Sequence, residues 1–259
     1  MEDQLLNGAV DKAIPVLDVD RRAWVFCTGR LVDLDVATEF SEDQVREFFT
    51  RAYESGDFPL GPIAYSPAEQ KVEFHSFFRS IVARQDHAGQ PYLESRIGYG
   101  KAGIIGNALT RSGRFDSGPI RPFDVLQSDV ETTLAEVIGQ LTLTAMLTGY
   151  RGAARYRVAV LGSPDTRLRR LDDETGELLA WQECADSFER FTMELQVTDD
   201  LDRPKVHAAV FPGVLRIAEQ FGAAGPQYFV DPHRRGTPAP MALSDELPQT
   251  LAGTAQRVD

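Results

Sequence analysis

The chain has 259 residues, of which 42% are hydrophobic and 25% charged, a composition typical of a globular protein that can bury a core. The 27 Lys and Arg residues against 39 Asp and Glu residues give a net charge of -12, which opposes binding to phosphate backbones and anionic membrane surfaces. The two cysteines lie far apart without a nearby histidine, which excludes a disulfide framework and a zinc knuckle.

The beginning of the chain predicts no targeting segment. Met1 is followed by Glu2 and Asp3 rather than by basic residues and an apolar run. No uninterrupted apolar stretch reaches the ~18 residues of a membrane span. We therefore expect a soluble, unprocessed, cytoplasmic protein without membrane association.

The first elements in chain order are predicted to be strands. Residues 14–17, 24–27 and 31–36 have the apolar or alternating pattern of strands, and a break at Gly29 predicts a hairpin over residues 22–36.

A capping box at residues 41–44 then predicts a helix that ends near Gly56. The next segment, residues 66–85, fits either a capped helix or strands. We favour strands, because residues 92–97 downstream also have a strand pattern and a meander is the simpler arrangement.

Residues 98–122 are rich in glycine and proline, which predicts little regular structure and a boundary between two parts of the chain. The first part, residues 1–110, is then a β-rich α+β unit, and the second, residues 123–231, is an α+β unit. Residues 232–259 have few large apolar groups and are predicted to form a disordered tail. Length and composition leave open whether the chain forms one domain or two.

The clearest helix signal begins at Ser128, which forms a second capping box with Glu131. Its apolar residues recur at helical spacing up to Gly149 and predict a central, buried helix. These residues are Val130, Leu134, Val137, Ile138, Leu141 and Ala145.

The remaining elements are a strand at residues 155–160, a hairpin over 167–182, a strand at 191–197 and a helix from about 204 to 222. Pro212 is expected to kink or split that helix. The predicted fold is therefore α+β, with mostly antiparallel sheets and helices packed on one face.

The first candidate site is the glycine-rich segment 98–106. Its Gly98, Gly100 and Gly103 match G-x-G-x-x-G, but neither the helix nor the acidic strand of a dinucleotide fold follows, so a glycine-rich bulge or loop is favoured. An enzyme acting on an anionic, phosphate-bearing substrate is one alternative function for this segment. Its candidate ligand-binding residues are Arg96, Gly98, Gly100, Lys101, Gly103 and Asp116.

The second candidate site is an arginine cluster in residues 151–170, which contain six arginines and one acid. The cluster suggests nucleic-acid binding, with Arg155, Arg157, Arg167 and Arg169 as its candidate residues. The following stretch, residues 171–202, holds eleven acids and one arginine. Pairing across the sheet with Glu177, Glu189 and Glu194 is the favoured interpretation, so nucleic acid is an unlikely partner.

Metal and cofactor sites are not expected. The pairs Asp18/Asp20 and Asp33/Asp35 could hold Mg²⁺ or Ca²⁺, but such sites usually take three or more protein oxygens, so a solvated strand face is favoured. The four histidines have no metal-ligand spacing. Cys27 and His207 are expected to be packing residues.

The leading hypothesis for function is a non-catalytic binding or regulatory module whose partner is a protein surface or a small, anionic ligand. It rests on the lack of any motif with its required context. The enzyme at residues 98–106 and the nucleic-acid binder at 151–170 are the alternatives. The sequence leaves the oligomeric state open.

Overall fold

A computed structural model describes the chain outside two long stretches, residues 35–69 and 230–259, and several short gaps. The described residues are 4–34, 70–74, 78–87, 90–100, 104–111, 113–115, 118–172, 175, 177–179, 182–183, 188–197 and 203–229.

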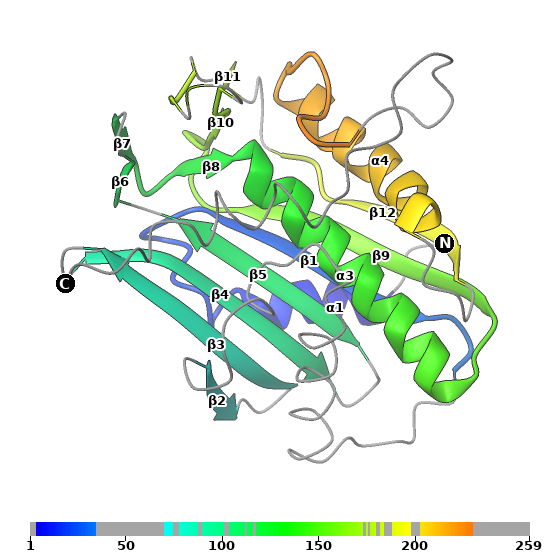
Figure 1. Cartoon of the computed structure of the whole chain (residues 1–259). Helices are drawn as coiled ribbons and strands as arrows, with labels where there is room; N and C mark the ends of the chain where they lie inside the picture. The colour runs from blue at the N-terminus through cyan, green and yellow to red at the C-terminus, as the bar shows by residue number, and fades with distance from the viewer. Residues whose placement is uncertain are drawn as a thin grey trace, which may run out of the picture.

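A seven-stranded antiparallel sheet forms the centre of the molecule, with the strand order β12-β9-β1-β5-β4-β3-β2 (Figure 1). A smaller sheet joins β11, β10 and β8, and β6 pairs with β7. The strands are β1 (Trp24–Leu31), β2 (Gln70–Phe74), β3 (Phe78–His87), β4 (Gln90–Gly100), β5 (Ile105–Arg111), β6 (Gly113–Phe115), β7 (Gly118–Ile120), β8 (Asp124–Leu126), β9 (Gly152–Leu161), β10 (Arg167–Arg169), β11 (Gln182–Glu183) and β12 (Phe191–Val197).

The described helices cover both faces of this sheet. The long helices α3 (Gln127–Thr148) and α4 (Arg203–Gln220) pack on one face, and α1 (Gln4–Ala13) packs on the other (Figure 1). Alternate residues of β1 divide between the two faces: Val25 belongs to the core under α3, whereas Trp24 packs with α1. The predicted α+β class is confirmed, while α1 was not foreseen.

Several elements form where the hydrophobic period of the sequence predicted them. Segment 66–85 contributes strands β2 and β3 rather than a helix, and β4 and β12 form where strands were expected. The pairing of β10 with β11 confirms the hairpin over 167–182.

The predicted hairpin at residues 22–36 is wrong, because β1 runs unbroken through Gly29. A Cβ atom on Gly29 would lie 2.6 Å from Leu141 Cδ1 and 3.2 Å from Val137 Cγ1, both on α3. The glycine thus lets the helix approach the strand instead of ending it. Residues 14–17 are also not a strand: they form turns after α1, where the Leu17 N–H donates to the carbonyl of Ala13.

A second glycine permits close contact between the two long helices. A Cβ on Gly213 of α4 would lie 2.6 Å from Leu134 Cδ2 on α3 and 2.7 Å from the hydroxyl of Tyr156 on β9. The helix is continuous through the preceding Pro212, so of the two outcomes expected for the proline, a kink or a split, the split does not occur.

The start of α3 differs from the predicted capping box. The hydroxyl of Ser128 has no hydrogen-bond partner within the described residues. The Glu131 carboxylate instead accepts hydrogen bonds from the backbone N–H groups of Gln227 and Tyr228, at 2.6 and 2.7 Å, and from Gln127 Nε2 at 3.0 Å. These hydrogen bonds therefore hold the segment after α4 against the N-terminal part of α3.

This contact predicts a pH-dependent stability. Burial raises the pKa of Glu131 to about 7 from an ordinary value of 4.5, so the folded state keeps a proton that the unfolded state loses between these pH values. The contribution of Glu131 is fully present below pH 4.5 and is lost as the pH rises through 7, by up to about 3 kcal/mol. Glu131→Gln should remove this slope, as measured by denaturant titration at pH 5 and pH 8.

Other buried titrating groups also contribute to the slope, so the test compares the variant with the unmodified chain. Equal pH dependence in both would contradict the assignment to Glu131.

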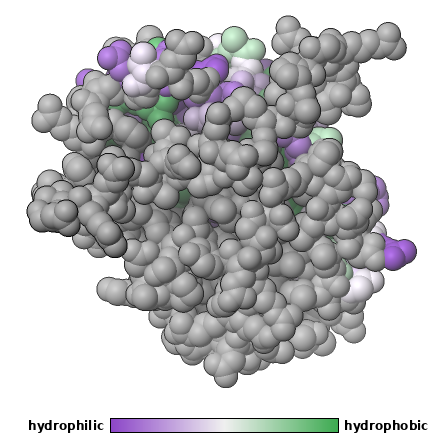
Figure 2. Space-filling model, in the orientation of Figure 1, coloured by the Kyte–Doolittle hydropathy of each residue, from purple (hydrophilic) through white to green (hydrophobic). Residues whose placement is uncertain are grey.

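Few large apolar side chains are exposed in the described residues: only Leu5 and Leu179, at 46% and 41%. In the view of Figure 2 the described surface atoms are mainly hydrophilic. None of the described helices is both long enough and apolar enough to span a membrane.

Three predictions fall outside the described residues: the helix at 41–56, its capping box, and the disordered tail at 232–259. The division into residues 1–110 and 123–231 stays a prediction.

Candidate functional site

One face of α3 carries a row of buried polar residues. Asp129, Thr133, Glu136 and Gln140 recur at intervals of four, three and four residues, which places them on one side of the helix, with Thr132 beside them. Each is at most 2% exposed. We call these five residues the polar row.

Strand β5 supplies partners for two members of the row. Asn107 Nδ2 donates a hydrogen bond to Glu136 Oε2. Four residues further along the strand, Arg111 donates from Nε and Nη2 to the two carboxylate oxygens of Asp129, at 3.0 and 2.8 Å. The row therefore lies between α3 and β5, and its charged end is neutralised by a bidentate ion pair.

The rest of the row has hydrogen-bonding capacity that the described residues do not use. Glu136 Oε1, both amide atoms of Gln140, and the hydroxyls of Thr132 and Thr133 are buried without a partner in the described part of the chain. Buried polar atoms in folded proteins are nearly always hydrogen-bonded, and an unsatisfied one costs about 1–3 kcal/mol. Several such atoms on adjacent turns of one helix therefore single out this face of α3 as the candidate site.

Glu136 differs electrostatically from Asp129. Burial raises the pKa of Glu136 well above its ordinary value, and the hydrogen bond from Asn107 opposes this shift only in part. The protonated, uncharged form is thereby favoured. Because Oε2 accepts from Asn107, the proton belongs on the unpartnered Oε1, which can then donate.

The structure describes some of the candidate residues of the glycine-rich site and leaves others outside the described part of the chain. Gly98 and Gly100 lie within β4 in regular register, and Gly98 is opposite Gly106 of β5, so the interpretation of these two residues as a bulge or loop is wrong. Strand pairing needs only a regular extended backbone, which glycine can adopt. Arg96 is in the same strand, opposite Ala108. The other candidates, Lys101, Gly103 and Asp116, lie outside the described residues.

The arginine candidates meet partners within the protein. Arg155 Nε pairs with Glu194 Oε2 at 2.7 Å across strands β9 and β12, as predicted. Arg157 Nη1 donates to the hydroxyl of Thr192 at 3.0 Å.

The two candidates on β10 are placed differently. Arg169 pairs with Asp124 of β8 at 3.3 Å rather than with the acids expected, and Arg167 lies opposite Glu183 in the register of β10 and β11. No ion pair of Glu177 or Glu189 is found in the described residues.

We predict no detectable binding of a fluorescent DNA duplex at physiological salt. The Arg155–Glu194 pair and the net charge of -12 both oppose phosphate contacts. Fluorescence anisotropy at low and at physiological salt, with an Arg155→Ala/Arg157→Ala variant as comparison, measures this. Salt-sensitive micromolar binding that the double variant abolishes would contradict it.

Asp18, Asp20 and Asp33 are also not on strand faces. Asp18 lies in the turns after α1, where it accepts from Arg22 Nε at 2.9 Å and from the Trp24 indole at 3.1 Å. Asp33 follows β1 with a φ of 58°, and Asp35 lies outside the described residues. Within the described part of the chain, no group of three potential metal ligands comes together.

Cys27 and His207 are buried packing residues, as predicted. Burial raises the pKa of the Cys27 thiol and lowers the pKa of His207. The His207 ring lies 4.9 Å from the ring of Phe229, centroid to centroid.

The polar row was not predicted, because the apolar stripe dominates the sequence pattern of the same helix. The signal was present: polar residues at 129, 133, 136 and 140 have helical spacing in a helix otherwise predicted to be buried all round. The chain matches no protein-family model, no curated protein and no solved structure. Its function is therefore inferred from the site alone.

Proposed function

We propose that this protein is a non-catalytic binding module for a small, uncharged, hydrogen-bonding molecule, held by the polar row between α3 and β5. The observation that carries the proposal is the set of buried, unpartnered atoms of Thr132, Thr133, Glu136 and Gln140. A molecule that satisfied them would recover the hydrogen bonds that burial has removed.

The charges of the site favour a neutral molecule. Arg111 already pairs with Asp129, and Glu136 favours its uncharged form. The remaining members of the row, Thr132, Thr133 and Gln140, carry no charge. A buried ion without a counter-charge is strongly disfavoured. The small anionic ligand expected from the sequence is therefore replaced, for this site, by a neutral one.

The unpartnered hydrogen-bonding groups of the row also define which donors and acceptors a ligand should carry. Protonated Glu136 offers a donor, and Gln140 offers one donor-rich nitrogen and one acceptor oxygen a turn away. Amides, and heterocycles that carry a carbonyl beside an N–H group, present the complementary pattern. We therefore place amides and lactam-type rings first among the ligand classes.

Thermal unfolding with matched probe pairs tests this proposal. Nicotinamide and uracil are the neutral members, and nicotinate and orotate are the corresponding carboxylates. We expect at least one neutral probe at millimolar concentration to raise Tm, because a ligand at 100 times its Kd stabilises by ~2.7 kcal/mol, while its charged partner does not. Absence of a shift with both neutral probes, or equal shifts with the charged ones, would contradict the proposal.

Two isosteric variants on the same helix locate the binding site. Thr133→Val removes an unpartnered hydroxyl, whereas Thr142→Val removes one that donates to the Ile138 carbonyl at 2.9 Å. We expect Thr133→Val to keep or raise Tm without ligand and to lose the ligand shift. Thr142→Val should keep the shift, and the opposite pattern would contradict a site at the polar row.

A further inference from the structure

A second site lies where strand β9 loses one of its neighbours. Its pairing with β1 continues to Leu161, opposite Trp24, but its pairing with β12 ends at Val158, opposite Phe191. Residues 159–161 therefore have no partner on the β12 side among the described strands. In an antiparallel strand the N–H and C=O groups of successive residues point to alternate sides, so main-chain polar groups of this segment face the gap.

The chain before β12 is held away from this edge by α4. The Glu189 N–H donates to Gln220 Oε1 at 2.8 Å, and Gln220 Nε2 donates to the Glu189 carbonyl at 3.0 Å. One side-chain amide thus takes both the N–H and the C=O group of Glu189. A pocket lies beside this contact, since Phe188 and Arg190, the two neighbours of Glu189 in the chain, both line it.

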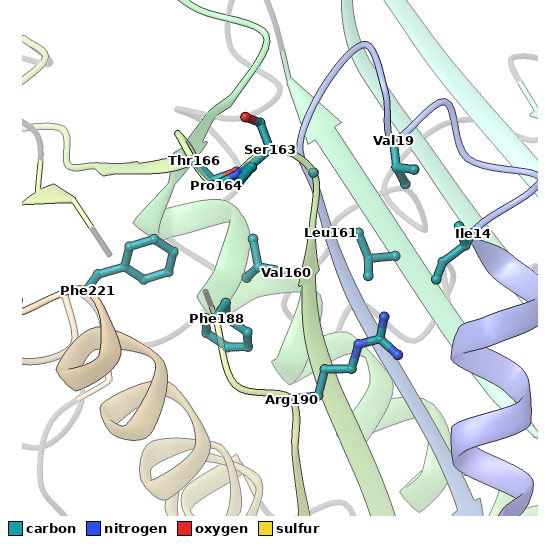
Figure 3. A pocket seen from close by; sticks show the side chains of 11 residues that line it. Ile14, Val19, Val160, Leu161, Ser163, Pro164, Thr166, Phe188, Arg190 and Phe221 are labelled. Atoms are coloured by element: carbon teal, nitrogen blue, oxygen red, sulfur yellow. The ribbon is translucent and has the colours of Figure 1, made fainter. Parts of the chain in front are cut away.

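The pocket has a volume of about 290 Å³, close to the lower end of typical small-molecule sites. Figure 3 shows that it extends around the end of β9, with Val160 and Leu161 pointing to opposite sides. The rings of Phe188 and Phe221 lie 5.9 Å apart, centroid to centroid. The apolar wall is formed by Ile14, Val19, Val160, Leu161, Phe188 and Phe221.

The lining of the pocket also contains a cationic side chain, that of Arg190. Arg190 contributes to the pocket, and its side chain is 37% exposed. Its Nη1 contacts Asp11 at 3.3 Å, but Asp11 is itself 67% exposed, and an exposed pair of this kind is easily exchanged. A guanidinium has five donors in a fork that fits a carboxylate, so most of its capacity is available to a ligand.

We propose that this pocket binds a small carboxylate with a compact aromatic or branched aliphatic body. The body packs between Phe188 and Val160, the carboxylate displaces Asp11 from Arg190, and the unpaired edge of β9 orients it. The rim is already ordered, because Thr166 Oγ1 donates to the Ser163 carbonyl at 2.6 Å and the Asp165 N–H donates to Ser163 Oγ at 3.2 Å. This site shares no residue with the polar row and does not depend on the function proposed there.

Isothermal titration calorimetry with phenylacetate, and with phenylacetamide as the uncharged match, tests the proposal on the full chain. We expect phenylacetate to bind and phenylacetamide to bind at least about tenfold more weakly, because the amide cannot pair with Arg190. Absence of phenylacetate binding at millimolar concentration, or equal binding of the two probes, would overturn the proposal.

Variants assign the binding to this pocket. Arg190→Gln should weaken phenylacetate binding at least about tenfold. Arg216→Gln should leave it unchanged, because Arg216 lies over the Phe191 ring, at 4.6 Å from its centroid, and does not line the pocket. Val160→Phe, which fills the pocket from a half-buried position, should abolish binding and keep the cooperative unfolding of the protein.

Phenylacetate binding that survives both Arg190→Gln and Val160→Phe would overturn the proposal. Thr133→Val should retain it, so failure at this pocket and failure at the polar row are distinguishable.

Discussion

Replacing Arg111 by methionine is expected to lower the free energy of unfolding by about 3–5 kcal/mol. Arg111 and Asp129 are 2% and 3% exposed at their side chains, and two nitrogens of Arg111 contact the carboxylate. Methionine fills much of the same volume, so the loss measures the buried carboxylate that is left without its counter-ion rather than a cavity.

The loss of unfolding free energy in the Arg111→Met variant should also depend on pH. Burial raises the pKa of Asp129, and Arg111 opposes that shift, so removal of Arg111 raises the pKa further. The variant then gains a proton on folding over a wider pH range. Its stability relative to the unmodified chain should therefore fall as the pH rises, and urea titration at pH 5 and pH 7 measures this difference.

A control is available at an ion pair that is partly exposed to solvent. Arg22 pairs with Asp18 at 2.9 Å, with side chains 17% and 35% exposed. Arg22→Met should cost no more than about 1 kcal/mol, because water solvates the remaining carboxylate. Similar losses at Arg22 and Arg111 would contradict the assignment of a buried ion pair to Arg111.

The sequence predicted those elements whose pattern and environment agree. Strand β9 has the period-2 pattern expected for a sheet buried more on one face, and its burial alternates from Ala154 to Val158 as predicted. Helix α3 was expected to be central, and its predicted apolar stripe is buried, namely Val130, Leu134, Val137, Ile138, Leu141 and Ala145. In both cases the hydrophobic period alone selects the structure.

The errors arise where contacts distant in sequence decide the outcome. Gly29 has the local pattern of a break, but its lack of a side chain is required by Leu141, more than one hundred residues later. Glu131 fits a capping box with Ser128, yet it accepts hydrogen bonds from Gln227 and Tyr228. Local patterns contain no information on such partners.

The two candidate sites also depend on contacts that local sequence patterns do not reveal. Gln140 and Glu136 are ordinary helix formers, and only the burial of polar atoms that lack a partner distinguishes them from a solvated helix face. The pocket beside β9 depends on where β12 ends and on the contact of Gln220 with the Glu189 backbone. Neither feature follows from a motif, which explains why motif analysis selected other residues.

Leu141→Ala is expected to lower the free energy of unfolding by about 2–5 kcal/mol, and Leu134→Ala by a similar amount. Both side chains are at most 1% exposed, and they lie where α3 meets β1 and α4 respectively. The loss combines the lost burial of the isobutyl group with the cavity that remains. Denaturant titration measures it, with the exposed Leu5→Ala as a control that should change little. Losses below about 1 kcal/mol at both sites would show that α3 is not part of the core.

A double-mutant cycle with Gly29 tests the contact itself. Gly29→Ala alone should be destabilising, because the new Cβ would lie 2.6 Å from Leu141 Cδ1. Leu141→Ala removes that atom and leaves space beside the strand. The double variant should therefore lose less stability than the two single losses added together, by at least about 0.5 kcal/mol. Additive losses would place Leu141 away from Gly29 and would contradict the close packing of α3 on β1.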